Sequence, residues 1–274
     1  MPGEPQLDEP SPEHWLLVSD VDDTLVGDDE ALETFLDLVR RSKYLTVAVN
    51  SSRPHESVMA TLRELPAGFT PRAVITALGT EVFVDGELLE SWRSRFRGFD
   101  RRPIDEAMEK LGLTPHAEEM QTPLKGSFSV PRGVPIDLVM EALEKLPVSL
   151  RTIVSHDGTD LDVIPREAGK GAATLHLAER LGVPMRQLVV AGDSANDVLM
   201  FDAVEKAIAV GNAREELLRV ADPVKTYFAS GGCAAGIIEG LRHWGAPLAM
   251  PNEEVRAHNA SSTDATSSNP RSDF

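Results

Sequence analysis

Two acidic clusters, far apart in the sequence, each follow a short apolar run, and this pairing restricts the fold more than any other feature. Residues 15–19 precede the first cluster, DVDDT at 20–24, and residues 188–191 precede the second, GDSAND at 192–197. Short runs that are apolar throughout are typical of strands buried in a parallel sheet. Carboxylates at the carboxyl ends of such strands face the crevice in which open α/β sheets bind ligands. The sequence therefore predicts that both clusters lie at one edge of a parallel sheet.

Strand and helix patterns alternate in the first and last thirds of the chain. Apolar residues at helical spacing predict helices at 30–41, 54–65 and 172–181. Runs of β-type residues predict further strands at 45–49, 73–76 and 206–210. This alternation predicts parallel βαβ units, from which doubly wound sheets are built.

The stretch between Gly79 and Pro165 follows a different pattern. Residues 81–89 read as two short strands around Asp85-Gly86, which predicts a hairpin with a two-residue turn. Beyond it, helices are expected at 104–111 and 135–146, and strands at 127–130, 148–154 and 161–164. This segment therefore predicts an α+β insertion.

We therefore predict an α/β protein with a doubly wound, Rossmann-like parallel-sheet core and an inserted α+β domain. The expected boundaries are residues 14–85 and 166–247 for the core and residues 86–165 for the insertion. Proline and acidic residues dominate the first segment, residues 1–13, and serine is frequent near the end of the chain. These compositions predict a disordered leader at 1–13 and a disordered tail at 248–274.

Charge and cysteine content exclude several classes of protein. The net charge of −17 opposes binding to nucleic acid or an anionic membrane, so we expect neither as a partner. The single cysteine, Cys233, excludes an intramolecular disulfide and favours a reducing compartment. The N-terminus lacks the basic and apolar regions of a signal peptide, and no run approaches the roughly 20 apolar residues of a membrane helix. These features predict a soluble cytoplasmic protein.

The first acidic cluster offers two carboxylates for two chemical roles. Asp20 and Asp22 are two positions apart at the end of a predicted strand, where they can diverge around one substrate. One carboxylate can attack phosphorus and form an aspartyl-phosphate, while the other gives a proton to the leaving oxygen and later takes one from water. The alternative is a solvated acidic turn or a helix N-cap, because short motifs recur by chance.

Other polar residues suit a phosphate and a metal ion. Asp193 and Asp197 are one helical turn apart, which suits magnesium; alternatively, Asp193 caps a helix and Asp197 is an exposed helix residue. Ser51 follows a predicted strand and can donate its hydroxyl and backbone N–H to phosphate, or it only shapes a turn. Lys170 lies at a predicted helix start, where it can reach a phosphate or be a surface lysine.

The ordered combination of these groups resembles the haloacid dehalogenase superfamily of phosphohydrolases, from Trp15 to about Trp244. By this resemblance the insertion is a sugar-phosphatase-type cap, Asp20 is the nucleophile and Asp22 is the general acid and base. The resemblance implies phosphate contacts from Ser51, Ser52, Lys170 and Asn196. It also implies a Mg²⁺ cofactor, with Asp20, Asp22, Asp193 and Asp197 as the metal-binding residues. Asp22 would bind the metal through its backbone carbonyl.

A closer resemblance is to sucrose-phosphate phosphatases. It is carried by residues 19–28 (SDVDDTLVGD), 76–82 (TALGTEV), 169–171 (GKG), 123–127 (PLKGS) and 160–165 (DLDVIP). The loop at 50–53, NSSR, departs from the expected Ala-Thr-Gly-Arg. The resemblance implies a magnesium-dependent phosphomonoesterase that converts a disaccharide phosphate, sucrose 6-phosphate first of all, to sucrose and phosphate through an aspartyl-phosphate.

Sugar recognition is expected from the cap and from the loop after residue 79. The candidate ligands are Thr80, Glu81, Lys125, Ser127 and Asp160. The alternative is that Lys125 and Glu81 are ordinary exposed charges or an ion pair. Other possible substrates are the phosphates of mannosylfructose, glucosylglycerol and trehalose, and association with a sugar-phosphate synthase is a further expectation.

A different class of function stays open, a non-catalytic sugar-phosphate-binding module that partners a glycosyltransferase. The presence of both Asp20 and Asp22 argues against it, because a binder needs neither a nucleophile nor a proton donor. Trp92 can stack on a sugar or lie in the core, and we favour the core. The histidines share no metal-binding spacing, so we expect surface or packing roles for His55, His116, His156 and His176.

Overall fold

The computed structural model describes residues 14–65 and 69–250. The predicted leader, 1–13, and most of the predicted tail lie outside the described residues. Residues 248–250 were expected to belong to that tail, but they lie against the core. The Ala249 N–H donates to Ser42 Oγ (2.9 Å), and Arg41 Nη1 donates to the carbonyl of Met250 (2.8 Å). Ordered contacts therefore continue past the predicted boundary at residue 248.

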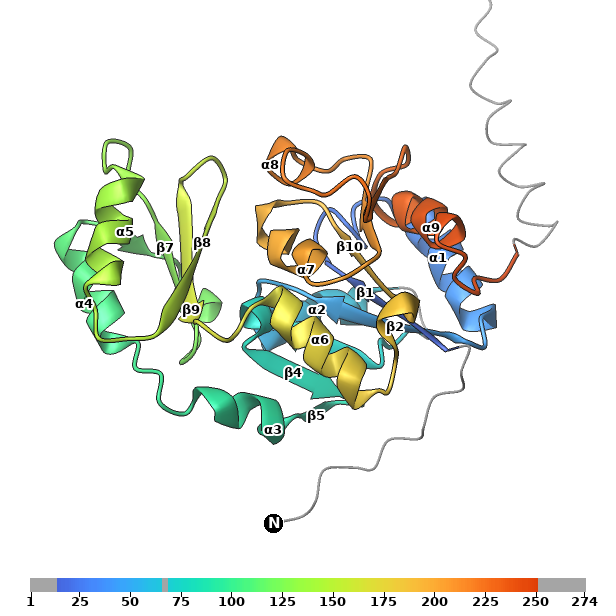
Figure 1. Ribbon diagram of the computed structural model, residues 1–274, viewed down its shortest axis with the longest axis horizontal. Helices are drawn as coiled ribbons and strands as arrows, with labels where there is room; N and C mark the ends of the chain where they lie inside the picture. Colours follow the sequence, from blue (N-terminus) through green and yellow to red (C-terminus); the bar gives the residue numbers. More distant parts are fainter. Residues whose placement is uncertain (1–13, 66–68, 251–274) are drawn as a thin grey trace, which may run out of the picture.

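An eight-stranded sheet forms the larger domain, in the order β12-β11-β10-β1-β2-β3-β4-β5 (Figure 1). Six of its strands are parallel: β1 (Trp15–Ser19), β2 (Leu45–Asn50), β3 (Ala73–Thr76), β10 (Leu188–Gly192), β11 (Ala207–Ala209) and β12 (Thr226–Phe228). The hairpin of β4 (Glu81–Val84) and β5 (Glu87–Leu88) adds antiparallel strands at one edge. The predicted doubly wound core is therefore confirmed, with β1 at its centre.

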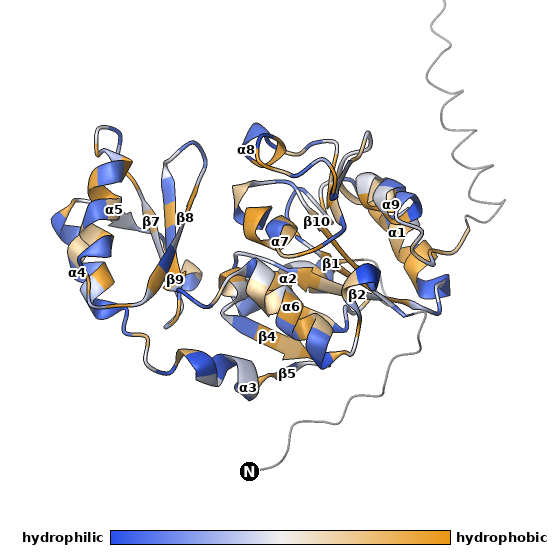
Figure 2. Ribbon diagram, in the orientation of Figure 1, coloured by the Kyte–Doolittle hydropathy of each residue, from blue (hydrophilic) through white to orange (hydrophobic). Residues whose placement is uncertain are grey.

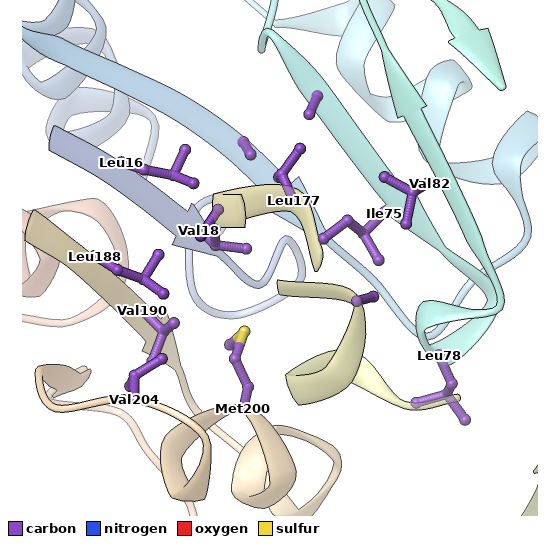
Figure 3. Close-up of a cluster of buried hydrophobic side chains, with 14 of the residues drawn as sticks. Leu16, Val18, Ile75, Leu78, Val82, Leu177, Leu188, Val190, Met200 and Val204 are labelled. Carbon is purple, nitrogen blue, oxygen red and sulfur yellow. The ribbon is translucent and has the colours of Figure 1, made fainter. Parts of the chain in front are cut away.

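Helices cover both faces of this sheet because successive residues of each strand point to opposite sides. Leu17 of β1 packs in the cluster that includes α1 (Asp29–Arg41), α2 (His55–Glu64) and α9 (Cys233–His243). Leu16 and Val18 pack in the opposite cluster, against α6 (Lys170–Arg180) and α7 (Val198–Asp202), as the side chains in Figure 3 show. Figure 2 shows hydrophobic residues along the central strands and hydrophilic residues on the helices around them.

The inserted domain has a four-stranded antiparallel sheet in the order β6-β7-β9-β8. Its elements are α4 (Arg102–Lys110), β6 (Thr114–Pro115), β7 (Gly126–Ser129), α5 (Ile136–Glu144), β8 (Leu150–Ser155) and β9 (Asp160–Pro165). Phe128 and Leu161 pack with α4 and α5 on one face of the sheet. Ile153 belongs instead to the buried cluster of the core, so the other face of the cap sheet is turned toward the core.

The segment after the β4–β5 hairpin belongs to the core by its contacts. Trp92, in α3 (Glu90–Arg93), is buried, donates from Nε1 to the Gly79 carbonyl (3.0 Å) and stacks on His176 of α6. Phe96 packs in the same cluster, whereas Phe99 packs with the cap. The expected boundary at residue 86 therefore precedes elements that pack on the core, and Trp92 is a core residue rather than a sugar platform.

Candidate active site

Three buried carboxylates meet at the carboxyl ends of β1 and β10. Asp20 follows β1, and Asp193 and Asp197 follow β10, with Ser19 paired to Ala191 in the register of the two strands. One oxygen of each carboxylate lies within 4.8 Å of the others. Asp197 is fully buried in the 3-10 helix η5 (Ala195–Asp197), so the interpretation of Asp197 as an exposed helix residue is wrong.

Lys170 is the positive charge of this cluster. Its Nζ donates to Asp20 Oδ1 (2.6 Å), Asp197 Oδ1 (2.7 Å) and Asn196 Oδ1 (2.7 Å). Burial works to lower the pKa of this ammonium, but the carboxylates of Asp197 and Asp20 outweigh burial and raise the pKa. The side chain is 1% exposed, so the interpretation as a surface lysine is wrong.

Glycines let the start of α6 approach the rest of the site. Gly169, just before Lys170, has a φ of +134°, and a Cβ on Gly79 would lie 2.3 Å from the Gly169 carbonyl oxygen. A Cβ on Gly171 would lie 2.0 Å from the carbonyl oxygen of Leu199 in α7. Side chains at residues 79 and 171 would clash with these carbonyls, and Gly169 is favoured by its positive φ, so the glycines permit the close packing around Lys170.

Negative charge exceeds positive charge at the buried centre. Burial first, and then the neighbouring carboxylates of Asp197 and Asp193, raise the pKa of Asp20 well above its usual range, although Lys170 opposes this. Burial and Asp197 likewise raise the pKa of Asp193 to about 6. Three carboxylates therefore share one buried ammonium, and an oxygen-bound divalent cation would relieve the excess charge. This donor set fits magnesium, which prefers oxygen ligands.

The three carboxylates are not equally available to a cation. Asp197 Oδ2 accepts the backbone N–H groups of Asp193 (3.0 Å) and Ser194 (3.2 Å), while its Oδ1 accepts from Lys170. Ser194, rather than Asp193, caps η5, and Asp197 completes the capping box. Asp197 therefore shapes the loop and fixes Lys170, and Asp20 and Asp193 have the less engaged oxygens.

Asp22 lies outside the three-carboxylate cluster. Its side chain is 53% exposed, and its Oδ2 is 2.8 Å from Nε of Arg53. A solvent-facing carboxylate beside a buried one suits a group that exchanges protons, and Asp20 and Asp22 of the DVDDT cluster occupy different environments.

Ser51 is buried at the end of β2, but one of its expected donors is already used. Its N–H donates to the Ile75 carbonyl (2.9 Å) in the β2–β3 ladder, and its Oγ accepts the N–H of Arg53 (3.1 Å). The expectation that the Ser51 N–H binds phosphate is therefore wrong, while its hydroxyl hydrogen stays available. Ser52 follows in the same loop and is half-buried.

Lys125 and Ser127 converge on one carboxylate of the cap. Lys125 is 2% exposed, and its Nζ lies 3.3 Å from Asp162 Oδ1. Ser127 Oγ donates to the same oxygen, as the cross-strand pairing of Ser127 with Asp162 allows. The interpretation of Lys125 as an exposed charge is wrong. Asp162 was not singled out in the sequence, although it lies two residues after Asp160 on the same face of β9.

The other sugar-binding candidates are differently placed. Asp160 lies between two histidines, with Oδ1 3.4 Å from His116 Nε2 and Oδ2 3.0 Å from His156 Nδ1. Thr80 is fully buried, and its hydroxyl donates to the Ala77 carbonyl, so its contribution is to the loop. Glu81 is half-buried at the start of β4 and accepts from the hydroxyl of Thr76 (2.9 Å).

Two further residues of the site were missed in the sequence. Thr24 Oγ1 donates to Asp193 Oδ1 (3.2 Å), and Arg214 Nε lies 3.7 Å from Asp193 Oδ2. Thr24 stands inside the DVDDT cluster, so the motif itself was a signal. Arg214 lies in the loop after β11, and no local sequence pattern indicates that it belongs to the site.

Comparison with known proteins now identifies the family. Residues 13–245 match the model of the sucrose-6F-phosphate phosphohydrolase family. The chain belongs to this family. Mannosylfructose-phosphate phosphatase of Agrobacterium fabrum is 34% identical over 241 residues, which are 84% of this chain and 96% of that protein. Sucrose-phosphatase 1 of Nicotiana tabacum is 30% identical over 250 residues, which are 84% of this chain but only 59% of that protein.

Solved structures agree with this family. The sucrose-phosphatase from Synechocystis, in complex with sucrose and phosphate, is similar with a TM-score of 0.78 and 28% identity over 85% of this chain and 98% of that chain. A haloacid dehalogenase-like hydrolase from Bacillus subtilis has a TM-score of 0.61 at 17% identity, which shows the fold alone. These comparisons confirm the predicted superfamily, fold and enzyme class, a phosphatase of sugar phosphates. Among the described residues, no helix has the length and apolarity to cross a bilayer.

Proposed function

We propose that the protein is a magnesium-dependent phosphomonoesterase that converts a disaccharide phosphate, sucrose 6-phosphate first of all, to the free sugar and phosphate through a phosphorylated Asp20. One observation carries the proposal: the ammonium of Lys170 joins Asp20, which follows β1, to Asp197 of η5, in a buried site with excess negative charge. A pure binding module would need no such nucleophile beside a metal-type acid cluster.

In the first step, a carboxylate oxygen of Asp20 attacks phosphorus, and the bond between phosphorus and the sugar oxygen breaks. Asp22 gives its proton to the departing sugar oxygen. In the second step, Asp22 takes a proton from water, whose oxygen attacks phosphorus and releases the Asp20 carboxylate and inorganic phosphate. The different burial of the two acids supports this division, because only Asp22 is half-exposed.

Phosphate would be held by the positive charge of Lys170 and by neutral hydrogen-bond donors. The Lys170 ammonium, which contacts both Asp20 and Asn196, would bind phosphate beside Asp20, and Ser51, Ser52 and Asn196 would add neutral hydrogen-bond donors. Magnesium, bound by Asp20, Asp193 and the backbone carbonyl of Asp22, would supply positive charge to the transferring phosphoryl group. Asp197 keeps Lys170 and the loop after β10 in place.

Sugar choice would lie on the cap face that is turned toward the core. Lys125, Ser127 and Asp162 form one hydrogen-bonded group there, and Asp160 with its two histidines forms a second. Glu81 would add a contact from the core, and Thr80 would hold its loop. Polar groups that are buried by a sugar must be paired by its hydroxyls, which makes them selective.

Mannosylfructose phosphate is the second candidate substrate, because the phosphatase of Agrobacterium fabrum named for it is similar over 96% of its length. The test is the relative kcat/KM of the full chain with magnesium for the phosphates of sucrose, mannosylfructose, glucosylglycerol and trehalose, with an aryl phosphate as reference. We expect a disaccharide phosphate containing fructose to lead. Equal kcat/KM for all sugar phosphates and the aryl phosphate would overturn the substrate assignment. The cytoplasmic location and the association with a synthase stay predictions.

A further inference from the structure

Arg53 joins the loop after β2 to Asp22 and to helix α2. Its Nε lies 2.8 Å from Asp22 Oδ2, and its Nη1 donates to Ser57 Oγ (3.3 Å) and Thr61 Oγ1 (3.1 Å). The Arg53 side chain is 20% exposed, against 53% for Asp22. The guanidinium is therefore a largely buried group that reaches out to a solvent-facing carboxylate.

The backbone of Arg53 is fixed as well. Its N–H donates to Ser51 Oγ (3.1 Å), and its carbonyl accepts the N–H of Ala77 (2.8 Å). Both main-chain groups are thus held by neighbouring loops at the same edge of the sheet. Because the backbone and the Nη1 end are both anchored, contacts other than Asp22 hold Nε in position.

Asp22 has no comparable support of its own. Among the described residues, Arg53 is the partner found for its carboxylate, and the contact uses Oδ2. The other oxygen, Oδ1, is then left for a proton. A general acid must lie within hydrogen-bond reach of the atom that receives its proton, and small errors of position are costly.

We infer that Arg53 is a positioning residue that orients Asp22 for both proton transfers. This inference rests on the proposed role of Asp22. The planar guanidinium can contact Asp22 on one side and α2 on another, a geometry that lysine does not reproduce. The competing interpretation is that Arg53 only ties the loop to α2 and stabilises the fold.

The test measures kcat and KM of Arg53→Met and Arg53→Lys on sucrose 6-phosphate and on an aryl phosphate with a good leaving group. A good leaving group needs little protonation, so loss of acid positioning should fall mainly on the sugar phosphate. We expect Arg53→Met to lower kcat for the sugar phosphate by about 10- to 100-fold, with KM nearly unchanged and a much smaller loss on the aryl phosphate. The kcat of Arg53→Lys for the sugar phosphate should lie between that of the unmodified protein and that of Arg53→Met.

A double-mutant cycle with Asp22→Ala separates positioning from general stabilisation. If Arg53 acts through Asp22, adding Arg53→Met to Asp22→Ala should change kcat by less than about twofold. The matched control is Arg72→Met, because Arg72 forms an ion pair with Asp85 (3.8 Å) outside the site. Arg72→Met should leave kcat unchanged for both substrates. The double variant Ser57→Ala, Thr61→Ala removes the contacts of Arg53 with α2 but keeps the charges of Arg53 and Asp22. It should also lower kcat more for the sugar phosphate than for the aryl phosphate, but by less than Arg53→Met does.

Four outcomes would overturn the inference. Equal losses by Arg53→Met on both substrates, or additive losses in the double mutant, would show a structural role only. Selective loss by Asp22→Ala without selective loss by Arg53→Met would reject Arg53 and leave the proposed function standing. Equal losses by Asp22→Ala on both substrates would reject Asp22 as the acid, and with it the role of Arg53.

Discussion

Lys170 Nζ lies 2.6 Å from Asp20 Oδ1, although the two residues are 150 positions apart in the chain. Both side chains are buried, and Asp20 and Asp197 together stabilise the Lys170 ammonium, whereas Asp197 disfavours the negative charge of Asp20. Burial opposes the ionised form of Asp20, and the ammonium favours it. A nucleophile must be ionised to attack, so under the proposed mechanism Lys170 would both bind the phosphate and favour the ionised form of Asp20.

Replacing Asp20 by Asn should nearly abolish turnover while the fold persists. The amide is a poor nucleophile, yet it has almost the same size as the carboxylate and fills the same space. Rapid quench of the unmodified protein with a sugar phosphate, followed by peptide mass analysis, should find phosphate on Asp20. Turnover of Asp20→Asn close to that of the unmodified protein would rule out the covalent route.

Magnesium binding should depend on pH through Asp193. Its pKa in the folded, metal-free protein is about 6, above the ordinary value of 3.8, because burial and Asp197 disfavour the charge. The protonated form therefore stabilises the fold at low pH, and this contribution is lost as pH rises through about 6. Magnesium needs the ionised form, so its affinity should rise over the same range and then level off.

Calorimetry and thermal melts can check this coupling. Magnesium should raise Tm more above a pH of about 6 than below it. Magnesium binding near a pH of about 6 should release protons. Asp193→Asn should remove this pH dependence and weaken magnesium binding, whether or not the protein is active. A magnesium affinity that does not change with pH would show that Asp193 is already ionised in the metal-free protein.

Removal of the metal should abolish hydrolysis, and addition of calcium should restore little of the activity. Calcium takes a larger and looser set of oxygen ligands than magnesium, which would misplace Asp20 relative to phosphorus. The measurement is the hydrolysis rate in chelator, then with each ion added back in excess. Undiminished hydrolysis in the chelator would refute the proposed metal site.

The core of the site was predictable because the positions and the ends of strands along the chain can be inferred from local patterns. Asp20 and Asp193 each follow a buried strand, and parallel strands bring their carboxyl ends to one edge. The domain boundary was not predictable from the hairpin alone, since nothing local shows that Trp92 packs on His176. The use of the Ser51 N–H by Ile75 depends on the register of β2 with β3, which the sequence of one strand does not contain.

The same limit explains why Asp162 was missed. Its contacts with Lys125 and Ser127 follow from the pairing of β7 with β9, in which Ser127 and Asp162 are 35 positions apart in the chain. Each residue alone is an ordinary polar side chain. Only the register places the three together on the face turned toward the core.

That pairing gives the last prediction, which concerns sugar choice. Lys125→Met and Asp162→Asn should each lower kcat/KM for sucrose 6-phosphate by about 10-fold or more, because an unpaired buried polar group costs about 1–3 kcal/mol. An aryl phosphate that does not reach the cap should be hydrolysed nearly as before. Lys145→Met is the matched control, since Lys145 pairs with Glu141 on the exposed side of α5 and should affect neither substrate. Equal losses on the two substrates would mean that Asp162 and Lys125 stabilise the cap without recognising the sugar.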